Sequence, residues 1–164
     1  MNMEIDVRLA VLVVMLGAWN AMNAIAQDAP PVAAFFLGNG KLSENGIEAG
    51  TPLPDGTEIK VYWDWDENGP DMKDPQPIVG DQVGQVNFNV FKINSADLGA
   101  EKGQFLSDPM FTVVGEMPKP AKYYLKICLP DRQLVSNVVT LTPGLADYEF
   151  AKWTVDKTPC PSKK

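Results

Sequence analysis

The sequence predicts an all-β fold, an antiparallel β-sandwich of about seven short strands that follows an export signal. Three observations predict it. Residues 57–65 alternate apolar and polar side chains with the two-residue period of a half-buried strand. Past Ala26, short apolar runs are separated by Gly, Pro, Asn and Asp, and no ten residues free of Gly and Pro carry a helix-period stripe. With 164 residues, 45% of them hydrophobic and 21% charged, the chain is long enough for one packed core.

The first 26 residues have the features of a secretory signal peptide, and residues 27–164 form the predicted single domain. An apolar run over residues 9–19 is followed by Ala24-Ile25-Ala26, which matches a small-x-small cleavage site. The run is too short to span a bilayer, so no membrane span is expected in the mature chain. The alternative is an N-terminal helix that stays attached as an uncleaved anchor. The signal predicts secretion to the periplasm, the cell surface or the extracellular space.

Composition argues against several classes of function. The chain has no histidine, which removes Ser-His and Cys-His nucleophilic catalysis and the common histidine-containing zinc sites. Its 21 acidic and 14 basic residues give a formal charge of −7, which argues against nucleic acid, a ligand bound by clusters of Lys and Arg. We therefore expect a protein that is not an enzyme and has no nucleic-acid partner.

Seven segments carry the apolar runs or the alternation of a strand. They are residues 32–37, 57–65, 86–93, 105–106 with 110–114, 123–129, 134–141 and 148–155. Pro54-Asp55-Gly56 predicts a turn before the second segment, because proline presets φ and glycine accepts a positive φ. Residues 129–134 have the length and chemistry of a hairpin turn, so residues 123–141 are expected to form a hairpin. One helical turn near residues 95–99 is allowed, because glycines interrupt anything longer.

About seven short strands in an exported chain are typical of a sandwich of immunoglobulin or fibronectin type, with a small barrel as the alternative. The last predicted hairpin combines a Tyr-rich strand, a short turn and the run Leu-Val-Ser-Asn-Val-Val-Thr-Leu-Thr at residues 134–142. It resembles the last hairpin of bacterial secreted immunoglobulin-like or fibronectin-like modules. The resemblance is limited to this hairpin and implies a fold rather than an activity.

The two cysteines, Cys128 and Cys160, both follow the predicted signal. An isolated pair in an exported chain predicts one disulfide, with two free thiols as the alternative. Alternation in residues 123–129 places Cys128 on the face opposite the apolar side chains, together with Tyr124 and Lys126. Cys128 is therefore expected to meet a C-terminal tail that crosses the outside of the sheet.

The segment from residue 64 to residue 81 holds most of the net charge. Its single base is Lys73, and its acids are Asp64, Asp66, Glu67, Asp71, Asp74 and Asp81, so the local charge is −5. Acids packed this closely repel one another unless a cation, a partner or open water screens them. The order Asp64-x-Asp66-x-Asn68-Gly69 matches the first half of an EF-hand calcium loop, whose glycine allows the sharp bend.

This half-motif resembles the calcium loops of EF-hand, dockerin and thrombospondin-type proteins. The resemblance stops at the twelfth position, where Pro75 stands in place of a bidentate glutamate, so a full EF-hand is excluded. The predicted cofactor is a structural calcium ion, because the candidate ligands are hard oxygens. Its predicted ligands are Asp64, Asp66, Asn68 and Asp71, with Asp74 and Asp81 as further candidates to complete the site. The alternative is a solvated acidic loop that binds no metal.

The aromatic residues around this loop divide between two faces of the predicted strand. Trp63 and Trp65 share the face of the apolar residues, which predicts that both pack into the core. Tyr62 lies on the opposite face and is a candidate ligand contact. Asn87 and Asn89 share one face of the next strand and are also candidate ligand contacts, although a solvated face explains them as well.

Together these features predict a secreted, calcium-stabilised, non-enzymatic structural or adhesion module of the cell surface or extracellular space. Exposed sheet edges suit self-assembly or contact with a cell-surface protein. One alternative is a carbohydrate-binding module, which requires an exposed aromatic row beside the acidic loop. A second is a small secreted hydrolase that uses the loop carboxylates as acid and base.

Overall fold

Two facing β-sheets form the layers of the domain. The computed structural model describes residues 32–77, 89–113 and 118–160. Within them the strands are β1 Val32–Gly38, β2 Leu42–Ser43, β3 Gly46–Ile47, β4 Glu58–Trp63, β5 Val90–Lys92, β6 Phe105–Leu106, β7 Phe111–Val113, β8 Lys122–Cys128, β9 Gln133–Ser136, β10 Val139–Thr140, β11 Gly144–Glu149 and β12 Trp153–Asp156, and the one helix is α2 Ser95–Leu98. The predicted all-β class is therefore confirmed. The predicted signal peptide lies outside the described residues.

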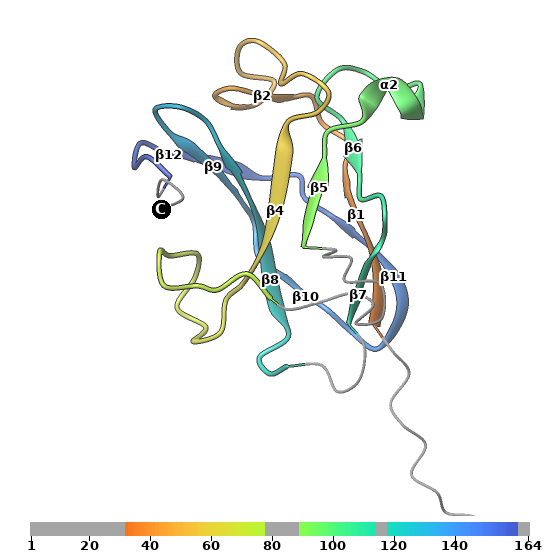
Figure 1. The fold of residues 1–164 in the computed structure, drawn as a ribbon, viewed down its shortest axis with the longest axis vertical. Coiled ribbons are helices and arrows are strands. Elements are labelled where there is room, and N and C mark those ends of the chain that lie inside the picture. Colours follow the sequence, from red (N-terminus) through yellow and green to blue (C-terminus); the bar gives the residue numbers. More distant parts are fainter. Residues whose placement is uncertain (1–31, 78–88, 114–117, 161–164) are drawn as a thin grey trace, which may run out of the picture. The chain divides into compact units, whose positions relative to one another are not determined.

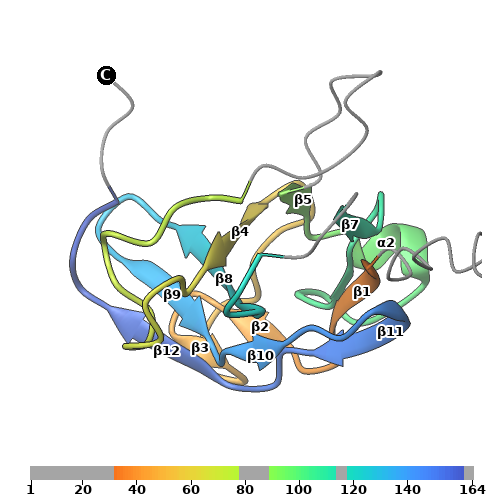
Figure 2. The same ribbon diagram turned by 90° about the horizontal axis from the view of Figure 1, so that it is seen from below.

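The two larger sheets form the layers of the sandwich (Figures 1 and 2). The four-stranded sheet has the order β11-β1-β6, and β7 also pairs with β1. The six-stranded sheet has the order β12-β9-β8-β4-β5, and β10 also pairs with β8. A small third ladder joins β2 to β3. The predicted hairpin is confirmed, because β8 and β9 pair antiparallel across the turn at residues 129–132.

One strand pair departs from the antiparallel arrangement that the sequence predicts. Strand β11 pairs with β1 in parallel, from Val32 opposite Gly144 to Leu37 opposite Glu149. Strands β2 to β10 lie between these two strands in the sequence, so their pairing is free of the geometry that a short hairpin turn imposes. Residue alternation reports which face is buried and carries no information on strand direction, which is why the pattern missed this pair.

The core fills the space between the two sheets. Alternate residues of β1, β4 and β8 point inward, and they include Phe36, Ile59 and Leu125, none of which is accessible to solvent. Ring contacts join the layers. The ring centroid of Phe111, in the four-stranded sheet, lies 5.5 Å from that of Tyr123, in the six-stranded sheet. Burying each such side chain contributes about 1.5–3 kcal/mol, so this interface supplies most of the stabilisation of the fold.

Three predicted strands are divided or shorter in the structure. The strand predicted at residues 134–141 is two strands, β9 and β10, which both pair with β8. The strand predicted at residues 57–65 ends at Trp63, where the acidic loop begins. The strand predicted at residues 148–155 is two strands, β11 and β12. Phe150 lies between them with its backbone NH bonded to the Leu37 carbonyl, 2.9 Å away, where the chain passes from one sheet to the other. Short β2 and β3 carry too few residues for a periodic signal and were not predicted.

The predicted helical turn is confirmed as α2. It ends at Gly99, whose φ of 62° is the left-handed conformation that glycine adopts without strain. The carboxylate of Asp55, in the predicted turn, accepts hydrogen bonds from the backbone NH groups of Ser95 and Ala96, both at 2.9 Å. A hydrogen bond from the Ser95 hydroxyl and, after it, these two backbone bonds lower the pKa of Asp55. The turn at residues 54–56 therefore fixes the start of the helix from a distance in sequence.

A disulfide joins Cys128 at the end of β8 to Cys160 in the C-terminal tail, with 5.7 Å between the two Cα atoms. The predicted pairing is confirmed. The tail crosses the outside of the six-stranded sheet as expected, and Thr158 accepts a hydrogen bond from the side chain of Gln133 on β9.

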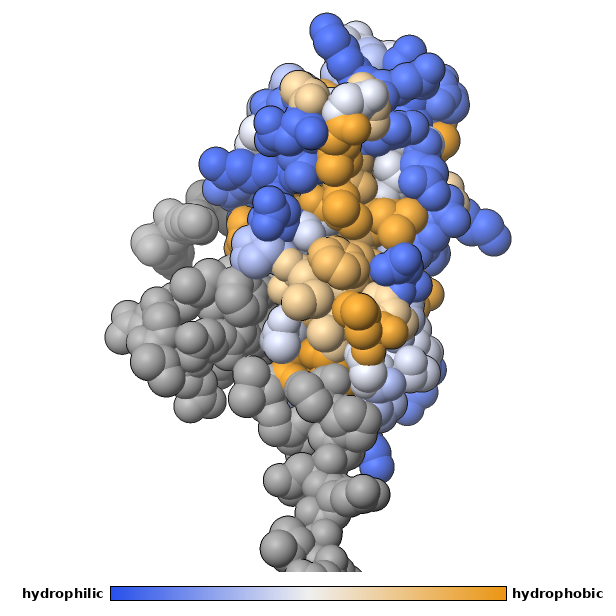
Figure 3. Space-filling model, turned by 90° about the vertical axis from the view of Figure 1, so that its right-hand side faces the viewer, coloured by the Kyte–Doolittle hydropathy of each residue, from blue (hydrophilic) through white to orange (hydrophobic). Residues whose placement is uncertain are grey.

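The outer face of the four-stranded sheet carries apolar side chains. Figure 3 shows them as a vertical stripe bordered by hydrophilic residues. Among them Leu145 of β11 is 69% exposed, and Phe35 and Leu37 of β1 are partly exposed. In the part of the chain that the structure describes, no helix has the length and apolar character needed to cross a membrane.

Candidate metal centre

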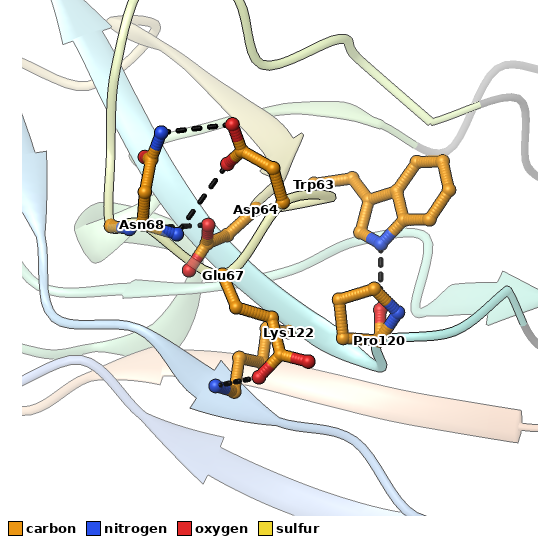
Figure 4. Close-up of polar contacts among 8 residues, drawn as sticks. Trp63, Asp64, Glu67, Asn68, Pro120 and Lys122 are labelled. Atoms are coloured by element: carbon orange, nitrogen blue, oxygen red, sulfur yellow. Dashed lines mark hydrogen bonds and ion pairs between the residues drawn. The ribbon is translucent and has the colours of Figure 1, made fainter.

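The acidic loop, residues 64–77, starts where β4 ends and returns to the same strand. The backbone NH of Asp64 donates to the carbonyl of Lys122 on β8, at 3.0 Å. The backbone NH of Trp63 donates to the carbonyl of Pro75 at 3.0 Å, which closes the base of the loop. The Trp63 indole NH donates to the carbonyl of Pro120 at 2.6 Å (Figure 4). The loop therefore has a fixed base on the outer face of the six-stranded sheet.

Three carboxylates of the loop converge. One ligand atom from each of Asp64, Asp66 and Asp74 lies within 4.8 Å of the others. Asp66 is exposed, whereas Asp64 is 2% and Asp74 is 5% exposed. Two like charges at this separation repel each other strongly when they are removed from water. The cluster therefore has the chemistry of a cation site.

The two oxygens of Asp74 have different surroundings. Its Oδ2 accepts hydrogen bonds from the Tyr124 hydroxyl and from the Asp71 backbone NH, both at 2.9 Å. Its Oδ1 is buried and has no hydrogen-bond partner among the described residues. Buried polar atoms in folded proteins nearly always have a partner, so this oxygen is the feature of the loop that most needs one.

A tight turn brings Asp64 and Asp66 to the same side. The backbone NH of Gly69 donates to Asp64 Oδ1 at 3.3 Å, and the Asn68 side-chain amide donates to Asp66 Oδ2 at 2.8 Å. Gly69 has a φ of 93°, which a side chain would disfavour, and Glu67 has a φ of 59°. The bend that the half-motif predicts at glycine is thus present.

None of the other predicted ligands that the structure describes is among these three carboxylates. Asp71 is not one of the three converging carboxylates, because its Oδ1 accepts the backbone NH groups of Lys73 and Asp74, at 2.6 and 3.1 Å. These hydrogen bonds, that of Lys73 first, lower the pKa of Asp71. Asn68 binds Asp66 through its amide. Asp81 lies outside the described residues.

The predicted ligand contacts are also placed differently. Tyr62 is half-buried, with its ring stacked on that of Tyr124 at 5.7 Å between centroids. Burial raises the pKa of its hydroxyl. Asn89 is buried, and its amide donates to the Pro77 carbonyl at 2.6 Å, so it supports the end of the acidic loop. Asn87 lies outside the described residues.

The prediction that Trp65 packs into the core is wrong. Trp63 packs partly against the core, but Trp65 is 48% exposed. The strand ends at Trp63, so the alternation that predicted both positions no longer applies two residues later. Trp65 therefore lies on the surface of the acidic loop.

Three lysines partly neutralise the loop, and two of them were missed from the sequence. Lys122 forms an ion pair with Glu67 (Figure 4), which raises the pKa of Lys122. Lys126 is only 6% exposed, and its Nζ donates to the Asp71 carbonyl at 2.6 Å. Burial lowers the pKa of Lys126. With Lys73, these bases set three positive charges against the five carboxylates of residues 64–74, which leaves a formal charge of −2.

Tyr124 and Lys126 are the residues that sequence reasoning overlooked. Alternation placed them on the outer face of the sheet, and in the structure both are buried beneath the acidic loop. The only signal in the sequence was chemical: a lysine and a tyrosine on the outer face of a strand in a chain with one long acidic loop.

Comparison of the chain with protein-family models, with curated proteins and with solved structures finds no match. The resemblances to immunoglobulin-like or fibronectin-like modules and to EF-hand or dockerin loops therefore stay predictions. The geometry of the acidic loop is therefore the feature that bears on function.

Proposed function

We propose that this chain is a secreted β-sandwich whose acidic loop binds a structural calcium ion, and that it acts as a non-enzymatic structural or adhesion module of the cell surface or extracellular space. Asp64, Asp66 and Asp74 are the proposed ligands. The observation that carries the proposal is the buried Oδ1 of Asp74, which has no hydrogen-bond partner in the described residues and belongs to the converging carboxylates. A bound cation would satisfy that oxygen.

Charge and ligand chemistry favour a divalent, hard cation. The formal charge of −2 that remains around the loop equals the charge that a divalent ion would neutralise. All three ligands are carboxylates, and calcium takes six to eight oxygens, so backbone carbonyls, Asn68 or water would complete the site. Zinc and copper prefer nitrogen or sulfur, and the chain has no histidine and both cysteines in a disulfide.

A stabilising role suits the burial of the site better than a catalytic one. Two of the three carboxylates are buried, and Lys126 and Tyr124 tie the loop to the sheet. Extracellular modules hold calcium with Kd values of about 0.1 to 1 mM, so occupancy follows the calcium of the medium. At a calcium concentration of about 100 times Kd, binding adds about 2.7 kcal/mol to stability.

The test is thermal unfolding of the oxidised chain in EDTA, in calcium and in magnesium. We expect calcium to raise the Tm by about 10 °C at about 100 times Kd, and magnesium to raise it much less. Asp74→Asn should remove most of the calcium effect. Asp147→Asn, which changes an exposed acid on β11, is the matched control and should keep it. Equal shifts in Asp74→Asn and the unaltered chain, or no calcium-specific shift, would contradict the metal site.

The proposed assembly partner is another copy of the chain or a cell-surface protein. The exposed apolar stripe on the four-stranded sheet supports this part of the proposal, as does the outer edge of β11, which among the described residues pairs with β1 alone. Sedimentation of the calcium-loaded chain over a range of concentrations tests self-assembly. A chain that stays monomeric at the highest concentration would leave only the heterologous partner.

A second candidate, carbohydrate binding, is favoured by the position of Trp65. Its exposed indole lies on the acidic loop between two proposed ligands, where a flat ring could stack on a sugar. Tyr62 is less suitable than the sequence predicted, because its ring is stacked on Tyr124. Glycan-array binding that requires calcium, is lost in Trp65→Ala and is kept in Met72→Ala, an exposed apolar residue of the same loop, would support this function.

A further inference from the structure

We infer that Tyr124 is a positioning residue for the metal site: its hydroxyl holds one oxygen of Asp74 so that the other oxygen faces the cation. The inference rests on the proposed calcium site. It concerns a residue of the sheet, which contributes no ligand to the metal and was not among the residues predicted from the sequence.

Tyr124 is held rigidly. It lies in the middle of β8, directly opposite Tyr62 of β4, and is fully buried. The rings of Tyr124 and Tyr62 stack with 19° between their planes, and the Lys126 ammonium lies 4.6 Å above the Tyr62 ring and 5.3 Å above that of Tyr124. A fully buried side chain that stacks on Tyr62 and contacts Lys126 in a central strand places its hydroxyl at a fixed point above the sheet.

That fixed hydroxyl determines how the Asp74 carboxylate is oriented. It donates to Asp74 Oδ2 at 2.9 Å, and the Asp71 backbone NH donates to the same oxygen at 2.9 Å. With Oδ2 occupied twice, the unpartnered Oδ1 is the oxygen left to join Asp64 and Asp66. Hydrogen bonds to the non-coordinating atoms of metal ligands commonly set the ligand geometry and tune the affinity of a site.

A second contact fixes the segment that carries Asp74. The Asp71 carbonyl accepts Lys126 Nζ at 2.6 Å and the Tyr124 hydroxyl at 3.3 Å. Asp71 and Asp74 also exchange backbone-to-carboxylate hydrogen bonds. Two adjacent side chains on one face of β8 therefore hold the turn that presents the buried ligand.

The experiment compares Tyr124→Phe with Tyr62→Phe, which removes a hydroxyl from the stacked neighbour without touching Asp74. Calcium affinity is measured by calorimetry on the oxidised chain. We expect Tyr124→Phe to raise the calcium Kd by about 10- to 100-fold and Tyr62→Phe to leave it nearly unchanged. Terbium bound in place of calcium supplies a second measurement, which would not change if Tyr124 only stabilised the fold. Its luminescence lifetimes in H2O and D2O count bound water, and Tyr124→Phe should add water as Asp74 leaves the ion.

A measurement on the unaltered chain covers the case in which Tyr124→Phe does not fold. With 13C-labelled tyrosine, the Cζ resonance of Tyr124 should shift during a calcium titration with the Kd of binding, whereas that of Tyr123, whose hydroxyl has no partner in the described residues, should not. Failure of the unaltered chain to bind calcium overturns the proposed function. Two results would overturn this inference alone. One is a Tyr124→Phe variant whose calcium Kd and number of terbium-bound waters both equal those of the unaltered chain. The other is a Tyr124 resonance that does not shift when the unaltered chain binds calcium.

Discussion

The two faces of strand β8 are both buried, but by different means. On the inner face Tyr123, Leu125 and Ile127 pack into the core between the sheets. On the outer face Tyr124 and Lys126 are covered by the acidic loop through hydrogen bonds to Asp71 and Asp74. One face is therefore buried by apolar contact and the other by polar contact.

The burial of the two faces therefore depends on different kinds of contact. Apolar burial is non-directional, and many neighbours share it, so the inner face tolerates small movements of any one of them. The polar cover depends on a few directed bonds to one loop, and a buried polar group that loses its partner is costly. We therefore expect a change in the acidic loop to alter the contacts on the outer face of β8 and to leave the packing on its inner face unchanged.

The largest expected effect comes from opening the inner face. Leu125→Ala should lower the free energy of unfolding by about 2–5 kcal/mol, because it removes apolar contacts and leaves a cavity. Urea unfolding measures the loss, and Leu145→Ala, at an exposed position on β11, is the matched control with an expected change below about 0.5 kcal/mol. Similar losses in the two variants would mean that the space between the sheets is not the main core.

An intermediate effect is expected on the outer face. Tyr124→Phe should lower the free energy of unfolding in EDTA by about 1.5–3 kcal/mol, because it removes a hydrogen bond to a charged carboxylate. Urea unfolding beside Tyr62→Phe measures the difference between the two hydroxyls. Equal stabilities of the two variants would show that the polar cover is not held by Asp74.

The smallest expected effect concerns the one polar atom on the inner face. The Tyr123 hydroxyl has no partner in the described residues, so Tyr123→Phe should change stability at pH 7 by less than about 0.5 kcal/mol. Burial raises the pKa of Tyr123 to about 12. The unfolded chain releases this proton near pH 10 and the folded chain does not, so stability is lost as pH rises above that value.

The Tyr123→Phe variant should therefore lose less stability than the unaltered chain as the pH rises. Between pH 9 and pH 11 we expect the unaltered chain to lose about 1–1.5 kcal/mol that Tyr123→Phe keeps, measured by urea unfolding in EDTA at each pH. Parallel pH profiles for the two proteins would contradict the shifted titration. A large loss at pH 7 would mean that the hydroxyl has a partner inside the core.

The difference between a face that meets the core and a face that is covered by a loop also explains which parts of the fold the sequence could predict. Alternation predicted β4 and the inner face of β8, because one face of each strand meets the core. It could not predict that β11 pairs in parallel with β1, since strand direction leaves no mark on residue period. Nor could it predict the break between β11 and β12, because Phe150 continues the apolar pattern while the chain crosses between sheets.

The candidate site was predicted in part for similar reasons. The spacing of Asp64 and Asp66 before a glycine is a local pattern, and the structure places both carboxylates together. Asp74 joins them only because the loop folds back, and Tyr124 and Lys126 meet it from a strand about fifty residues away in sequence, a separation that local pattern does not report. Trp65 was misplaced because a strand period was extended past the end of the strand.

The disulfide also decides how the domain would carry a pulling force. Tension applied to the chain beyond Cys160 passes through the sulfur atoms into Cys128 and the central strand β8. The segment between the two cysteines, which are 32 positions apart, then bears no load along its backbone and cannot be drawn out. After reduction the same tension would act first on β12, an edge strand whose ladder partner is β9. For a module that tethers surfaces, oxidation would therefore set how far the domain extends before its central sheet is loaded.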